Sequence, residues 1–169
     1  MVKNSELIGK QAPPLELPSI PNGDLYKLPI GEKPIALFFF PAANTPGCTK
    51  EACSFRDAQT QNIVFKRSPN LLVVGVSGDA TTKQSLFADQ YNLPYPILSD
   101  VDNSARKLYG VGKAFLGLTP GRETFFIDEK GIVKGVCDKA LDVNAHIKFV
   151  EQQLLDIEKS QASQAGHTD

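Results

Sequence analysis

The chain has 169 residues, with 18 Lys and Arg against 19 Asp and Glu, so its formal net charge is −1. This length corresponds to one domain, and 41% apolar residues suffice for a sizeable core, which excludes a chain that is disordered along most of its length. The near-zero charge argues against a general binder of nucleic acid or anionic membranes, and three cysteines are too few for a disulfide scaffold.

The first part of the chain is predicted to form a β-hairpin, a buried strand and a helix. The hairpin joins residues 15–20 to residues 25–28, because Asn-Gly between two apolar runs is a hairpin signal. Residues 34–40 form a continuous apolar run, which predicts a strand buried on both faces. After a loop over 41–47, a helix is expected over 48–65.

The rest of the chain is predicted to alternate between strands and helices. In order, these are a strand over 71–77, a helix over 81–91 capped by Asp79 or Thr81, a strand over 95–99, a helix over 102–109, a loop over 111–121, a hairpin of 122–128 and 132–137, and a helix over 143–157. This order predicts an α/β fold with a mostly parallel central sheet, antiparallel at one edge, and helices on both faces. We expect a single domain over 1–159 and a disordered tail over 160–169, because the tail has no apolar face to bury.

The segment from Pro41 to Cys53 is the one most suggestive of chemistry, because it follows a buried strand and opens a helix. Thr45 is suited to the N-cap and Pro46 to the first helical position, which places Cys48 in the first turn. Free backbone N–H groups and the helix dipole favour a thiolate there. The alternative is that Cys48 is a small apolar residue that happens to begin a helix.

A second cysteine, Cys53, follows five residues after Cys48. On an ideal helix their Cα atoms would lie about 8.6 Å apart, whereas a disulfide needs a Cα separation below about 7 Å. Either the two cysteines act independently, or the helix must unwind locally before they can bond. The spacing matches neither a C-x-x-C redox motif nor a recognised zinc pattern, and we expect no metal and no cofactor.

Two stretches of this sequence resemble a known family. The pattern Pro41-x-x-x-Thr45-x-x-Cys48 resembles the active-site signature of the peroxiredoxins. The longer stretch over 45–57, and a second over 118–128, resemble the bacterioferritin comigratory protein, or peroxiredoxin Q, branch. The resemblance implies a thioredoxin-like fold with an N-terminal β-hairpin extension and a central mixed sheet flanked by helices. It also implies thiol-dependent reduction of hydrogen peroxide and organic hydroperoxides.

The resemblance also implies a role for each matching residue. Cys48 would attack the peroxide, Thr45 would hydrogen-bond the peroxide and the thiolate, and Pro41 would shield the pocket. Arg122 would hold the thiolate and polarise the peroxide. Cys53 would resolve the sulfenic acid as an intramolecular disulfide after local unwinding, and thioredoxin or a similar dithiol protein would reduce that disulfide.

Other residues are expected to be structural. Arg56 is interpreted as a support for the helix that carries the two cysteines, and Cys137 as a residue that packs at the end of a strand. His146 is expected on the polar side of the last helix, and neither it nor His167 is expected to bind metal or take part in catalysis.

Two other function classes remain open: a general disulfide oxidoreductase, and a redox sensor or holdase that binds partners once its helix unwinds. The combination of Pro41, Thr45, Cys48 and Arg122 favours the peroxidase, because a passive sensor does not need a group that polarises peroxide. Neither a signal peptide nor a membrane span is visible. We expect a cytoplasmic monomer that contacts neither membrane nor nucleic acid, the alternative being a chloroplast or thylakoid-associated mature form.

Overall fold

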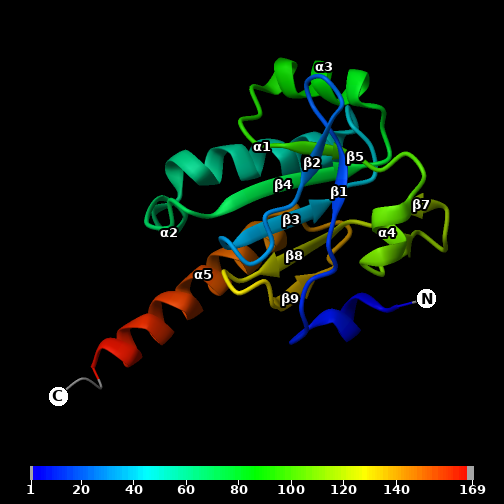
Figure 1. The fold of residues 1–169 in the computed structure, drawn as a ribbon. Coiled ribbons are helices and arrows are strands. Elements are labelled where there is room, and N and C mark those ends of the chain that lie inside the picture. The colour runs from blue at the N-terminus through cyan, green and yellow to red at the C-terminus, as the bar shows by residue number, and fades with distance from the viewer. Residues whose placement is uncertain (1, 167–169) are drawn as a thin grey trace.

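Seven strands form the central sheet of the computed structural model, which describes residues 2–166 (Figure 1). Their order across the sheet is β2-β1-β5-β4-β3-β8-β9. Their bounds are β1 Glu16–Ser19, β2 Asp24–Lys27, β3 Ile35–Phe39, β4 Leu72–Ser77, β5 Ile97–Ser99, β8 Glu123–Ile127 and β9 Val133–Cys137. The loop predicted over 111–121 contains a second, two-stranded sheet of β6 (Lys113–Ala114) and β7 (Thr119–Pro120).

The sheet is mixed. Strands β3, β4 and β5 are parallel to one another, whereas β8 pairs antiparallel with β3, β9 with β8, and β1 with both β2 and β5. The prediction of a mostly parallel sheet is therefore wrong outside the three central strands, whereas the prediction of a central mixed sheet flanked by helices is confirmed. Both hairpins are confirmed, and each adds its strands antiparallel to the edge that it joins.

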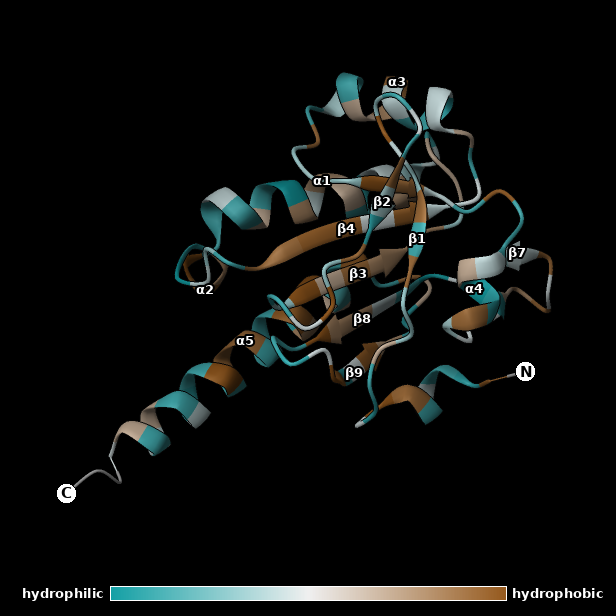
Figure 2. Ribbon diagram, viewed as in Figure 1, coloured by the Kyte–Doolittle hydropathy of each residue, from teal (hydrophilic) through white to brown (hydrophobic). Residues whose placement is uncertain are grey.

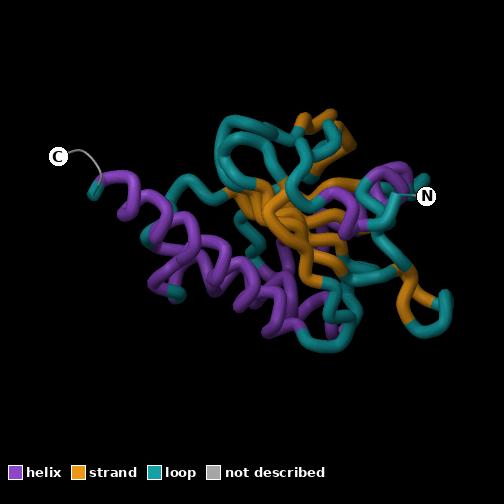
Figure 3. Tube along the Cα trace, turned by 90° about the horizontal axis from the view of Figure 1, so that it is seen from below, coloured by secondary structure: helices purple, strands orange, loops and turns teal. Residues whose placement is uncertain are grey.

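Helices cover both faces of this sheet. They are the 3-10 helix η1 (Asn4–Leu7), α1 (Pro46–Gln61), α2 (Ile63–Lys66), α3 (Thr81–Tyr91), α4 (Ser104–Leu108) and α5 (Val143–Ala165). Strand β3 supplies both cores, because alternate side chains of a strand point to opposite faces. Phe38 packs in the core beneath α1, α3 and α5, whereas Phe39 packs in the core beneath α4 and η1. The apolar colouring of β3 and β4 in Figure 2 and the position of α5 along one side of the strands in Figure 3 follow this division.

The predicted helix that carries the two cysteines differs from the structure at its C-terminal end. It begins at Pro46, the predicted first helical position, but it is interrupted at Asn62, where α1 ends and the short helix α2 begins. The Asn62 side chain accepts hydrogen bonds from the N–H groups of Val64 and Phe65, at 2.9 and 3.3 Å. An asparagine that caps in this way favours a new helix start over continuation of the old one.

Helix α5 is longer than predicted. It continues through residues 160–165, where the sequence predicted a disordered tail, and residues 167–169 of that tail lie outside the described residues. Helix α3 has the predicted bounds, but its N-cap is Ala80, so neither of the two predicted caps is used. Within the described residues, no helix combines the length and apolar character that crossing a bilayer requires.

Candidate active site

The first turn of α1 begins as the sequence predicts. Thr45 is the N-cap and Pro46 the first helical residue, so Cys48 is the third residue of the helix. The Thr45 hydroxyl does not cap a first-turn N–H; it donates instead to the Ala42 carbonyl at 3.0 Å. Cys48 is only 1% exposed, and it packs in the core beneath α1.

Arg122, which lies just before β8, reaches across to the cysteine. Its Nη2 lies 3.4 Å from Cys48 Sγ, its Nη1 pairs with the Glu51 carboxylate, and its Nε donates to the Ala140 carbonyl at 3.1 Å. Gly47 leaves the space for this approach, because a Cβ atom there would lie 3.1 Å from Nη2. The structure therefore brings together the two residues that the resemblance paired, which lie 74 positions apart in the sequence.

Glu51 is a member of this site that the sequence interpretation missed. It lies three residues after Cys48 on α1 and is 0% exposed, with one carboxylate oxygen on Arg122. Burial raises its pKa to about 7 against the opposing effect of Arg122. Residues i and i+3 share a helix face, so a carboxylate at this spacing on the buried side of α1 was the available signal.

A small cavity of about 140 Å3 opens beside these groups. The residues that line it include Pro41, Gly47, Arg122, Phe115 and Leu141. Since a water molecule occupies about 30 Å3 in the liquid, the cavity has room for a small hydroperoxide next to the guanidinium. Phe115 is also 55% exposed, which leaves an apolar rim at the entrance.

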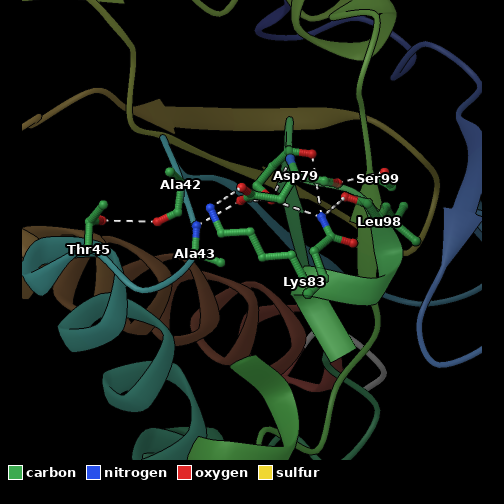
Figure 4. A network of polar contacts seen from close by, with 9 residues as sticks. Ala42, Ala43, Thr45, Asp79, Lys83, Leu98 and Ser99 are labelled. Atoms are coloured by element: carbon green, nitrogen blue, oxygen red, sulfur yellow. Dashed lines mark hydrogen bonds and ion pairs between the residues drawn. The ribbon is translucent and has the colours of Figure 1, made fainter. Parts of the chain in front are cut away.

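The loop before α1 is fixed from the end of β4 (Figure 4). Asp79 accepts a hydrogen bond from the Ala43 N–H at 2.7 Å and another from Ser77 Oγ at 2.9 Å. Lys83 pairs with the other carboxylate oxygen at 2.8 Å. Burial would raise the pKa of Asp79, but these hydrogen bonds and the lysine charge together lower it. The negative charge of Asp79 therefore helps to hold the segment that presents Pro41.

A second buried arginine, Arg106 on α4, links the residue that follows β3 to the segment that precedes β8. Its Nη2 donates to the Phe40 carbonyl at 2.7 Å and its Nη1 to the Gly121 carbonyl at 2.9 Å. Phe40 directly precedes the active-site loop, and Gly121 directly precedes Arg122. The sequence interpretation did not select Arg106, because a helical arginine with partners this far away leaves no local pattern.

Cys53 lies further along the same helix and is half-buried, and all three cysteines are free thiols. Burial raises the pKa of Cys53, while Arg56 opposes that shift. Because Cys48 and Cys53 both lie within the unbroken helix α1, the spacing argument applies to this state of the protein. Tyr95 donates to the Ala52 carbonyl at 2.6 Å, directly beside Cys53.

Arg56 links α1 to the end of α3, since its Nη1 donates to the Tyr91 carbonyl at 2.6 Å. This contact agrees with its interpretation as a helix support. Cys137 is buried at the end of β9, where burial raises its pKa. The prediction for His146 is wrong in its placement, because the ring is 0% exposed and lies against β8 rather than on the polar side of α5.

Comparison with known proteins gives consistent matches. The AhpC/TSA family model matches residues 8–136. The chain is 43% identical over 115 residues to "Peroxiredoxin Q, chloroplastic" of Sedum lineare, an alignment that covers 68% of this chain and 60% of the relative. The corresponding wheat protein (Triticum aestivum) is 41% identical, with 68% of this chain and 51% of the relative covered. The chain thus spans roughly half to three fifths of the length of the curated relatives it matches.

Solved structures agree in fold. Peroxidoxin BcpB from Mycobacterium tuberculosis has a TM-score of 0.77 and 35% identity, covering 89% of this chain and 97% of that one. Xanthomonas campestris peroxiredoxin Q has a TM-score of 0.73 at 24% identity, covering 84% and 90%, which is a likeness of fold alone. These matches confirm the predicted thioredoxin-like architecture. The chain therefore belongs to the AhpC/TSA family and is a peroxiredoxin of the peroxiredoxin Q branch.

Proposed function

We propose that the chain is a thiol-dependent peroxidase in which Cys48 attacks hydroperoxides. The observation that carries the proposal is the contact of 3.4 Å between the Cys48 sulfur and the buried guanidinium of Arg122, beside a cavity of small-molecule size. A guanidinium that cannot lose its charge stabilises both the thiolate and the negative charge that develops on the peroxide oxygens. The family supports the same activity.

In the first step, the Cys48 thiolate attacks the terminal oxygen of the hydroperoxide. The S–O bond forms as the O–O bond breaks, the hydroxyl stays on sulfur as a sulfenic acid, and the released alkoxide takes up the proton that the thiol gave up earlier. Arg122 stabilises the charge as it moves from sulfur to oxygen. Because the Thr45 hydroxyl donates to Ala42, its lone pairs are free to accept the peroxide O–H.

In the second step, the Cys53 thiolate attacks the sulfenic sulfur, the S–S bond forms, and hydroxide leaves with a proton as water. The two cysteines share α1, so the helix must unwind locally before this bond can form. A dithiol protein of the thioredoxin type then reduces the disulfide by exchange. Since both cysteines belong to one chain, a monomer is sufficient for the whole cycle.

The rim of the cavity and the relatives of the chain bear on the substrate class and on the compartment. The apolar rim of Phe115 and Leu141 suits hydroperoxides with an alkyl group, and a structure of the Xanthomonas campestris bacterioferritin comigratory protein is described in terms of alkyl peroxide reduction. The curated relatives named chloroplastic favour the chloroplast alternative over the cytoplasmic one.

The test measures peroxide consumption by the wild type and by Cys48→Ser, Cys53→Ser and Cys137→Ser, with thioredoxin as the reductant. We expect no turnover for Cys48→Ser, one equivalent of peroxide consumed by Cys53→Ser, and wild-type turnover for the control Cys137→Ser. Mass spectrometry of the oxidised wild type should find the disulfide between Cys48 and Cys53. Turnover by Cys48→Ser would refute the proposal, and disulfide exchange without peroxide consumption would favour the general oxidoreductase.

A further inference from the structure

His146 is a buried titratable residue that the proposed chemistry does not use. It is the fourth residue of α5, and its ring is 0% exposed between that helix, β8 and the segment after β9. A fully buried histidine needs partners for both ring nitrogens, because an unpaired buried polar atom is costly.

Both ring nitrogens have such partners. Nε2 lies 2.9 Å from the carbonyl oxygen of Lys139, and Nδ1 lies 2.7 Å from the hydroxyl oxygen of Thr124. A carbonyl oxygen only accepts, so Nε2 carries the proton and donates to Lys139, and Nδ1 accepts from the Thr124 hydroxyl. These two contacts select one neutral tautomer of the ring.

The Lys139 carbonyl belongs to the short segment between β9 and α5 that also reaches the active site. The next residue, Ala140, accepts the hydrogen bond from Arg122 Nε at 3.1 Å, and Leu141 forms a wall of the cavity. One hydrogen-bonded path therefore leads from the His146 ring through residues 139 and 140 to the guanidinium that contacts Cys48.

We propose that His146 is a positioning residue of this peroxidase: its Nε2–H fixes the 139–141 segment, and the Ala140 carbonyl of that segment orients Arg122 towards the Cys48 sulfur. The proposal rests on the function proposed above. His146 does not touch the reacting atoms, so its effect is on how often the guanidinium has the orientation that favours oxidation of Cys48.

Burial is the main reason that the His146 ring favours its neutral form. Burial lowers the pKa of His146, and the charge of Arg122 on the β8 side lowers it further, whereas the Lys139 carbonyl and the carboxylates of Asp138 and Asp142 act in the opposite direction. The net shift is downward. A protonated ring would lose the acceptor at Nδ1 and would add a second cation close to Arg122.

Two substitutions of similar size separate the two ring contacts. His146→Gln places an amide N–H near the position of Nε2 and can keep the bond to Lys139, whereas His146→Asn places its amide oxygen near Nδ1 and can keep only the bond to Thr124. We expect Cys48 oxidation by hydrogen peroxide to slow about tenfold in His146→Asn, and to stay within about threefold of wild type in His146→Gln, because one hydrogen bond that orients a charged group is at stake. The later rate of disulfide formation should be unchanged in both.

The proposal is overturned if the two variants oxidise at the same rate, or if His146→Gln is the slower one. A wild type that consumes no peroxide would instead refute the proposed function, which separates the two failures. A measurement on unaltered His146 adds an independent check: ¹⁵N NMR, with His167→Gln leaving a single histidine, should show hydrogen on Nε2 at pH 7. Hydrogen on Nδ1 would overturn the proposal even if neither variant folds.

Discussion

Adding one methyl group at Gly47 should lower the peroxidase rate without lowering stability. The Cβ atom of Gly47→Ala would lie 3.1 Å from Arg122 Nη2, so the guanidinium must withdraw by a few tenths of an ångström from a sulfur 3.4 Å away. A hydrogen bond to a charged group is worth about 1.5–3 kcal/mol. Losing about half of it raises the barrier by about 0.8–1.5 kcal/mol, which is about four- to twelvefold in rate.

Folding should respond differently, because Gly47 is the second residue of α1 and alanine is the better helix former by up to about 1 kcal/mol. That gain offsets the strain at Arg122, so we expect a free energy of unfolding within about 1 kcal/mol of wild type. The control is Gly112→Ala, whose Cβ would make an ordinary contact of 3.8 Å with Glu123.

The chain has no tryptophan, so the rate of Cys48 oxidation is best measured by competition with a haem peroxidase for limiting hydrogen peroxide. Unfolding in urea is followed by circular dichroism. An oxidation rate in Gly47→Ala equal to that of Gly112→Ala would show that the contact between Arg122 and the sulfur does not limit the reaction. A slow Gly47→Ala that is also strongly destabilised would point to a folding defect instead.

Three further perturbations test the supports of the site. The pKa of Glu51 is raised in the fold from 4.5 to about 7, so its contribution to the free energy of unfolding is full below pH 4.5 and is lost as pH rises through 7. Over that range the wild type should lose up to about 3 kcal/mol of stability relative to Glu51→Gln. Equal pH slopes of the two proteins in urea unfolding would contradict this. Tyr95→Phe removes the hydrogen bond from Tyr95 to the Ala52 carbonyl of α1, which should cost about 1 kcal/mol of stability and speed disulfide formation about fivefold. The rate is measured by quenched mass spectrometry, and an unchanged rate would show that this hydrogen bond does not limit the unwinding of α1. Asp79→Ala should lower the free energy of unfolding by about 1–3 kcal/mol, because it leaves the Ala43 N–H unpaired. The control Lys83→Ala removes only the exposed partner of Asp79 and should cost less than about 1 kcal/mol. Similar losses of the two variants in thermal unfolding would contradict the role of Asp79 in holding the loop before α1.

Local sequence patterns predicted most of the secondary structure, because apolar periodicity, hairpin turns and helix starts depend on neighbouring residues. The central strands, both hairpins and the start of α1 near Cys48 were predictable for this reason. The strand directions at the edges of the sheet, and the extension of α5 to Ala165, were not.

Only part of the candidate active site could be predicted from the sequence. Cys48 was predicted from the active-site signature and Arg122 from the second resembling stretch, over 118–128. Glu51, Arg106 and His146 instead depend on partners that only the fold brings close. Glu51 and Arg122 are 71 positions apart, and Arg106 and Phe40 are 66 apart. The sequence does not distinguish a buried charged residue from an exposed one, so these residues could be assigned to the site only once their burial was known.

The stacking of Phe55 on Phe38 limits how far α1 is expected to unwind on oxidation. Phe55 is fully buried on α1, and the two ring centroids lie 4.6 Å apart. Pulling a buried phenylalanine into water costs roughly 1.5–3 kcal/mol, a cost that the disulfide does not require. We therefore expect Phe55, two residues beyond Cys53, to hold the rest of α1 in place, so that oxidation unwinds the helix only before Phe55 and reduction refolds the first turns onto an unchanged core.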